Sequence, residues 1–145
     1  MKKINDILKR CNVIETVGSD DRSVAALVFD SRKSEEGAAF FAVRGTQVDG
    51  HDYIASAIEK GASAIVCEEL PQQQTQGVSY VVVADSNAAM ADMAAAFYDY
   101  PSEELKLVGV TGTNGKTTTS FMIWQMLNHA GLRAGLMTTV AWGVN

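Results

Sequence analysis

The segment from Lys106 to Gly131 constrains the fold more than any other part of the chain. It reads as an apolar strand (KLVGV, 106–110), a glycine-rich loop (TGTNGKT, 111–117) and a helix (TTSFMIWQMLNHAG, 118–131). A strand that leads through such a loop into a helix points backbone N–H groups and the positive end of the helix dipole at an anion. This order predicts an α/β fold with a phosphate-binding loop.

The loop also supplies the side chains that a nucleoside triphosphate needs. Glycines let the chain curl around phosphate groups without a Cβ in the way. Lys116 would reach the terminal phosphates as a point charge and serve as the catalytic residue, and the Thr117 hydroxyl would bind Mg²⁺. The alternative is a plain helix N-terminus whose glycines only make a turn. We expect ATP to be bound by Gly112, Thr113, Asn114, Gly115, Lys116, Thr117 and Thr118.

The glycine spacing departs from the usual phosphate-loop pattern, G-x-x-x-x-G-K-[ST]. Val110 stands where the first glycine of that pattern belongs, and glycines stand at Gly109 and Gly112 instead. The resulting string, T-G-T-N-G-K-T, resembles that of the Mur ligase family, whose members are ATP-dependent amide-forming enzymes. The resemblance implies that a carboxylate is activated as an acyl phosphate, which an amine then attacks.

The upstream sequence resembles the same family through a second set of motifs. These are Asp30-Ser31-Arg32, Gly37 before the run F-F-A-V, the segment 45–51 (GTQVDGH) and the segment 61–66 (GASAIV). They are similar to the N-terminal domain of the two Mur ligases that add the third amino acid and the final dipeptide. The resemblance implies a domain that holds the UDP end of UDP-N-acetylmuramoyl-L-alanyl-D-glutamate. By that resemblance, the UDP-binding residues are Ser31, Thr46, Gln47 and Val48.

Thr113 favours the member of the family that adds a diamino acid, because the dipeptide-adding member usually has serine at this position. We expect meso-diaminopimelate as the amino acid, from the base rate among bacterial enzymes, while the sequence leaves lysine open. Two alternatives remain. One is the ligase that adds D-alanyl-D-alanine, and the other is a UDP-sugar-binding or nucleotide-binding module without catalytic activity. Taken alone, the stretch 30–32 is an ordinary turn, and Asp49 is the cap of the next helix.

Strands and helices alternate before the glycine-rich loop, which predicts α/β layers with largely parallel sheets in both parts of the chain. The face shared by Met90, Met93 and Phe97 is expected in the core. Ser86 is a candidate cap for that helix. One more strand begins at Arg133. Strands are predicted over 23–30, 38–43, 62–67 and 79–85, and helices near 4–8, over 52–61 and after Ser86.

Charge is distributed unevenly along the chain. All 17 acidic residues lie at or before Glu104, whereas Lys106, Lys116 and Arg133 follow it. We therefore place a domain boundary at this point. Residues 1–104 are predicted to form the UDP-substrate-binding domain, with a mixed or parallel sheet. Residues 105–145 are predicted to begin a central ATP-binding domain with its first strand, phosphate loop, helix and strand.

A phosphate-loop ATPase also needs a carboxylate that helps to hold Mg²⁺, normally on a later strand. Residues 105–145 contain none. The resemblance places the carbamylated lysine of a further magnesium site, and the domain that binds the amino acid, downstream of Asn145. We therefore expect an N-terminal fragment of a longer enzyme that is inactive by itself.

Composition and charge narrow the function further. A net charge of −5 gives no support for nucleic-acid binding. No apolar run is long enough for membrane insertion, and the start, MKKINDILKR, lacks the continuous apolar core of a signal peptide. Cys11 and Cys67 lie far apart without a metal-binding pattern, which favours reduced thiols in a cytoplasmic protein. The sequence leaves the oligomeric state open.

Overall fold

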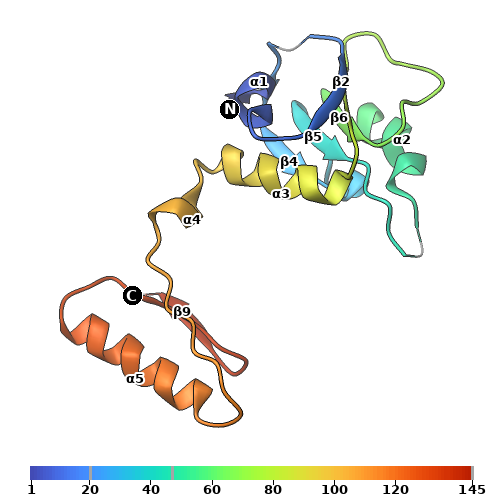
Figure 1. Ribbon diagram of the computed structural model, residues 1–145. Helices are drawn as coiled ribbons and strands as arrows, with labels where there is room; N and C mark the ends of the chain where they lie inside the picture. Colours follow the sequence, from blue (N-terminus) through green and yellow to red (C-terminus); the bar gives the residue numbers. More distant parts are fainter. Residues whose placement is uncertain (20, 47, 145) are drawn as a thin grey trace. The chain divides into compact units, whose positions relative to one another are not determined.

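The computed structural model describes residues 1–19, 21–46 and 48–144 (Figure 1). The chain divides into two compact units, Met1–Glu104 and Leu105–Asn145. We call them unit 1 and unit 2. In the described part of the chain, no helix has the length and apolar character needed to cross a membrane.

Unit 1 is built on a five-stranded sheet with the strand order β2-β7-β6-β5-β4. Neighbouring strands are parallel from β4 to β7, whereas β2 pairs antiparallel with β7. This mixed, mostly parallel sheet confirms the predicted fold class. The strands are β2 (Val13–Val17), β4 (Ala26–Val28), β5 (Ala38–Phe41), β6 (Ala64–Cys67) and β7 (Ser79–Val83).

Helices cover both faces of this sheet, so its central strands are apolar throughout. Side chains alternate along each strand: Phe41 and Val66 pack with α1 and α3, whereas Phe40 and Ile65 pack with α2. A further two-stranded pair, β1 (Lys2–Lys3) with β3 (Ser23–Val24), lies beside α1. The helices are α1 (Ile4–Leu8), η1 (Ser31–Lys33), η2 (Gly50–Tyr53), α2 (Ile54–Glu59), α3 (Ser86–Phe97) and α4 (Pro101–Glu104).

Helix α3 corrects one prediction and confirms another. Its cap is Asp85, whose carboxylate accepts N–H groups from the first turn, and not Ser86. Ser86 is instead the first helical residue and is fully buried. The predicted core face is confirmed, because Met93 is buried and both Met90 and Phe97 pack against the same cluster.

Unit 2 consists of α5 (Lys116–His129) and a hairpin of β8 (Gly135–Met137) and β9 (Trp142–Val144). The prediction of a parallel sheet here is wrong, because β8 and β9 pair antiparallel. Two strands joined by a four-residue turn can pair only in this way, since a parallel connection needs a long crossover. The predicted strand at 106–110 is irregular, and Leu107 and Val108 are 82% and 66% exposed. No described strand pairs with this segment, so its backbone has no ladder to join.

Candidate functional site

The glycine-rich loop of unit 2 leads directly into α5. Gly112 and Gly115 have φ angles of 146° and 79°, which L-residues with a Cβ rarely adopt. The first helical hydrogen bond runs from the Thr119 N–H to the Gly115 carbonyl, at 2.9 Å. The amides just before Thr119 therefore have no acceptor within the helix. Such an exposed helix N-terminus is suited to bind an anion.

Lys116 lies over this loop. Its ammonium group donates to the carbonyls of Gly112 and Thr113, at 2.5 and 3.1 Å. Thr117 is half-buried, whereas Thr113, Asn114 and Thr118 are exposed. The structure thus gathers the predicted ATP-binding residues around one helix end, as the contiguous sequence requires.

Residues 105–145 supply only part of the ligands that a Mg²⁺ site needs. The Thr117 hydroxyl lies in the first turn of α5, and residues 105–145 contain no carboxylate to join it. Among the described residues, no group of three His, Cys, Asp or Glu side chains could hold a metal ion. Any carboxylate ligand of the ion must come from outside residues 105–145.

In unit 1, the turn Asp30-Ser31-Arg32 follows the carboxyl end of β4. The Asp30 carboxylate accepts the Arg32 backbone N–H at 3.0 Å and two guanidinium donors at 2.9 Å each. The pKa of Asp30 is lowered to about 2, mainly by the Arg32 side chain and to a smaller extent by the Arg32 backbone N–H. Ser31 itself is buried, with 7% exposure. The stretch is therefore a capped turn, as its residues alone suggest.

A loop from Arg44 to Asp49 follows β5, the strand beside β4. Its Thr46 and Val48 are exposed, whereas Gln47 lies outside the described residues. Because β4 and β5 are parallel, the turn at Ser31 and this loop emerge at the same edge of the sheet. Ligands of α/β proteins commonly bind at that edge.

Sequence reasoning missed the groups that surround this loop. Glu68, directly after β6, accepts the backbone N–H and the hydroxyl of Ser86, which hold its pKa below the ordinary value. The ring nitrogens of His51 bond to groups on both sides, the Asp49 carboxylate and the Glu68 backbone N–H. An acidic residue placed directly after a buried strand is the signal that could have indicated Glu68.

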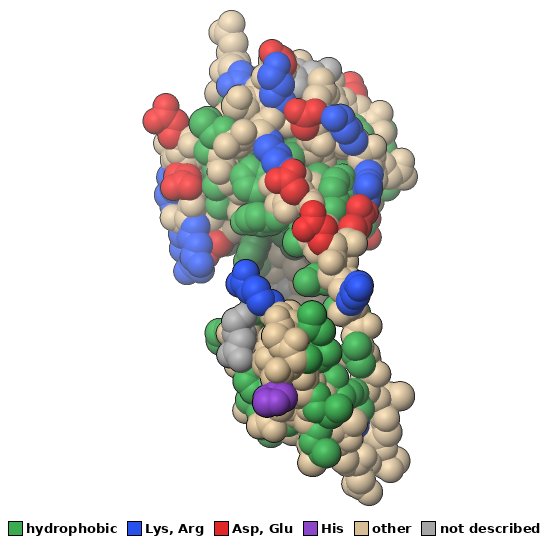
Figure 2. All heavy atoms as spheres, turned by 90° about the vertical axis from the view of Figure 1, so that its left-hand side faces the viewer, with side chains coloured by type: hydrophobic (Ala, Val, Ile, Leu, Met, Phe, Trp, Pro, Cys, Tyr) green, Lys and Arg blue, Asp and Glu red, His purple; other side chains and the backbone are tan. Residues whose placement is uncertain are grey.

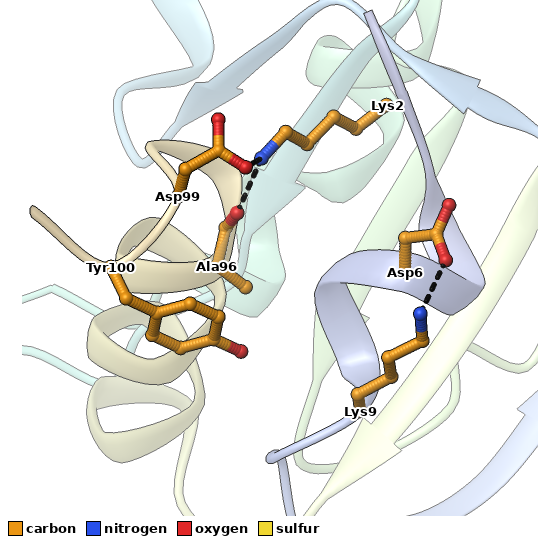
Figure 3. A pocket seen from close by; sticks show the side chains of 6 residues that line it. All are labelled: Lys2, Asp6, Lys9, Ala96, Asp99 and Tyr100. Carbon is orange, nitrogen blue, oxygen red and sulfur yellow. Dashed lines mark hydrogen bonds and ion pairs between the residues drawn. The ribbon is translucent and has the colours of Figure 1, made fainter.

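A cavity of about 330 Å³ lies elsewhere in unit 1, between α1 and the end of α3 (Figure 3). Its cations are already paired, since Lys2 bonds to Asp99 and the Ala96 carbonyl, and Lys9 bonds to Asp6. None of the predicted site residues lines it. We therefore do not assign the candidate site to this cavity.

Comparison with known proteins identifies the family. The sequence profile described as "Mur ligase family, catalytic domain" matches residues 23–98, which is more than half of the chain. The UDP-N-acetylmuramoyl-L-alanyl-D-glutamate--2,6-diaminopimelate ligase of Cytophaga hutchinsonii is 48% identical over 139 residues, covering 95% of this chain and 29% of the relative. The enzyme of the same name from Bacteroides fragilis is 46% identical over 138 residues, covering 95% and 28%. The chain thus spans less than a third of these relatives.

Solved structures of Mur ligases are also similar to this chain. The MurF ligase of Thermotoga maritima in complex with ADP matches with a TM-score of 0.51 and 30% identity, covering 74% of this chain and 24% of that one. A UDP-N-acetylmuramoyl-L-alanyl-D-glutamate--2,6-diaminopimelate ligase matches with a TM-score of 0.66 over 99% of this chain and 28% of that one, and its 24% identity supports the fold alone. This chain belongs to the Mur ligase family.

Proposed function

We propose that this chain is part of a ligase that uses ATP to add meso-diaminopimelate to UDP-N-acetylmuramoyl-L-alanyl-D-glutamate, in the cytoplasmic synthesis of peptidoglycan precursors. The observation that carries the proposal is the 48% identity to a relative with that name. Because 139 residues of this 145-residue chain are aligned, the alignment includes both the loops of unit 1 and the glycine-rich loop of unit 2.

Each unit has its own role in this proposal. Unit 1 would bind the UDP end of the substrate through Ser31, Thr46, Gln47 and Val48. Unit 2 would bind the phosphates of ATP at residues 112–118. The ADP in the Thermotoga maritima relative supports nucleotide use within the family.

The proposed reaction has two steps. The D-glutamyl side-chain carboxylate takes the terminal phosphoryl group of ATP and becomes an acyl phosphate, and the diaminopimelate amine then displaces phosphate to form the amide. Lys116 would stabilise the negative charge that develops on the transferred group. Mg²⁺, when bound, would supply further neutralisation, with the Thr117 hydroxyl as one ligand. Since unit 2 contains no carboxylate, this chain by itself is proposed to be inactive.

The relatives favour diaminopimelate addition over the alternatives. The sequence relatives reported above that carry the diaminopimelate name, and others of the same name, are 42% to 49% identical to this chain. A solved D-alanyl-D-alanyl ligase from Acinetobacter baumannii is 29% identical over 73% of this chain, and the solved diaminopimelate ligase is 24% identical over 99%, so the proposal rests on the sequence relatives and not on the solved structures. Assaying the full-length enzyme with each pair of substrates separates the two reactions. A binding module without chemistry would turn over neither pair.

Calorimetry tests the binding role directly on this chain. We expect UDP-N-acetylmuramoyl-L-alanyl-D-glutamate to bind with a dissociation constant below about 1 mM, a modest affinity for a site of this kind. The Lys116→Ala variant is the matched control, because its altered residue lies in unit 2 and should leave this affinity unchanged. In the full-length enzyme the same variant should abolish turnover. No detectable heat at millimolar substrate, or retained turnover in Lys116→Ala, contradicts the proposal.

A further inference from the structure

The loop Arg44–Asp49 is closed tightly at its base. The Gly45 N–H donates to the Val48 carbonyl, and the Gly50 N–H donates to the Val43 carbonyl, both at 2.9 Å. Arg44 and Asp49 form an antiparallel bridge across the loop. The loop therefore has a defined base, and what holds this base against the sheet decides where Thr46 and Val48 lie.

His51 connects the base of the loop to the end of the neighbouring strand β6. Its Nδ1 lies 2.6 Å from Oδ1 of Asp49, and its Nε2 accepts the backbone N–H groups of Glu68 and Glu69, at 3.0 and 3.4 Å. Because Nε2 accepts, the ring proton belongs to Nδ1 and is donated to the Asp49 carboxylate. The side chain is only 15% exposed, so water competes little for these bonds.

Charged groups extend this connection to α3. Glu68 binds Ser86 through Oε1, and its Oε2 lies 3.6 Å from Nε of Arg44. Arg44 also pairs with Asp49 at 3.4 Å and with Glu69 at 2.6 Å. One cation thus lies among three carboxylates at the edge of the sheet. The loop after β5, the end of β6 and the start of α3 are joined in one network with His51 at its centre.

We propose that His51 is a positioning residue for binding of a uridine nucleotide, because it fixes the loop Arg44–Asp49 to the end of β6. This inference rests on the proposed function, which places the nucleotide at Thr46, Gln47 and Val48. A loop that is already held in place loses less conformational entropy when a ligand binds, so the anchor strengthens binding without contact to the ligand. In metal sites, mutation of a group that orients a ligand typically weakens the affinity by about 10- to 100-fold. We expect a loss of affinity of about tenfold here.

Two amide variants of His51 test this role because they differ by one methylene group. Glutamine can carry its side-chain carbonyl about as far as Nε2, whereas asparagine is too short and reaches only about as far as Nδ1. His51→Gln should therefore keep an acceptor for the N–H groups of Glu68 and Glu69, and His51→Asn should lose it. His129→Asn is the control, because His129 is exposed at the end of α5.

Two quantities are measured on the 145-residue chain: hydrogen exchange of the Glu68 and Gly50 amides without ligand, and the affinity for UDP by calorimetry. In His51→Asn we expect exchange to be about tenfold faster and the affinity for UDP about tenfold weaker, in keeping with the loss of one good hydrogen-bond acceptor. His51→Gln should stay within about threefold of the unaltered chain in both quantities. His129→Asn should change neither.

The outcomes separate this inference from the proposed function. If the unaltered chain does not bind UDP, the proposed site is wrong, and the exchange rates still report whether His51 holds the loop. Faster exchange in His51→Asn with unchanged affinity for UDP shows a merely structural role and overturns the inference. Equal losses in His51→Gln and His51→Asn, with both folded by circular dichroism, also overturn it. If His51→Asn does not fold, the test rests on His51→Gln alone. A folded His51→Gln chain with a weakened affinity for UDP would then contradict the inference.

Discussion

At the scale of single residues, Asp30 is the charged group whose behaviour the structure defines most sharply. Its pKa is lowered from 3.8 to about 2, chiefly by the Arg32 side chain. Because the folded value lies below the unfolded one, the contribution of this carboxylate to stability is present above pH 4. It is lost as the pH falls through about 2. The turn that contains Ser31 should therefore stay intact at mildly acidic pH.

A ¹³C NMR titration of the Asp30 carboxyl carbon measures this pKa. We expect a midpoint near 2 in the unaltered chain. In Arg32→Gln the midpoint should move up towards the ordinary value, because the guanidinium donors are gone while the backbone N–H remains. An equal midpoint in the two proteins would show that Arg32 is not the cause.

The two cysteines should react slowly in the folded chain. Burial raises the pKa of Cys67 to about 11, and burial together with the nearby Asp92 does the same for Cys11. The thiolate is the reactive form, and only a small fraction of either cysteine is in that form at pH 8. A thiol-specific reagent should label neither residue quickly in buffer, and should label both once the chain is unfolded in urea. A Cys11→Ser variant shows which thiol has reacted. Rapid labelling of this variant in buffer would contradict the burial of Cys67.

At the scale of elements, Gly50 links the candidate UDP loop to η2 through close contact of two backbones. A Cβ at this position would lie 2.6 Å from both the N and the O of Val43. Gly50→Ala should therefore force a backbone shift and lower the free energy of unfolding by about 3 kcal/mol, the upper range for overpacking. Urea denaturation followed by circular dichroism measures the change.

Gly77→Ala is the matched control for Gly50→Ala. Gly77 also lies in unit 1, where its φ is +86°, but a Cβ there would meet nothing within 4 Å. Only the strained backbone conformation remains, which costs about 1 kcal/mol. If the two variants are equally stable, the contact with Val43 has no energetic weight.

The buried strands of unit 1 were predictable from sequence, because β5, β6 and β7 are continuous apolar runs between polar turns. Strand β2 was missed, since its residues VIETV are half-exposed and mix polar with apolar side chains. The cap of α3 was placed one residue late because Asp85 and Ser86 are both good cap residues. The segment 106–110 has strand composition, but strand formation depends on a partner that composition does not reveal.

The candidate site likewise has one part that is predictable from sequence and one part that is not. The glycine-rich loop is contiguous in sequence, so its residues are necessarily close in space. The anchor at His51 joins residues 17 positions apart, through its bond to the Glu68 N–H. This contact depends on the pairing of β5 with β6 and on the direction in which the chain leaves each strand. Neither is encoded in a local pattern.

At the scale of the whole molecule, the two units differ in how much apolar surface they bury. Every buried hydrophobic residue among those described lies between Ile4 and Ala96, within unit 1. Helix α5 has no buried residue, and apolar side chains are exposed over unit 2, the lower part of Figure 2. The most exposed of them are Leu107, Val140, Trp142 and Val144, together with Met137.

This difference predicts unequal stability of the two units. Isolated helices of about 14 residues are marginal in water, and α5 is 14 residues long and packs, within unit 2, on a two-stranded hairpin. In hydrogen exchange at neutral pH, we expect the amides of α5 to exchange orders of magnitude faster than those of β5, β6 and β7. A chain that ends at Glu104 should unfold within about 2 °C of unit 1 in the whole chain, because it retains the entire core. Slow exchange throughout α5, or a large loss of thermal stability on removing residues 105–145, would show that unit 2 has stabilising contacts beyond its own helix and hairpin.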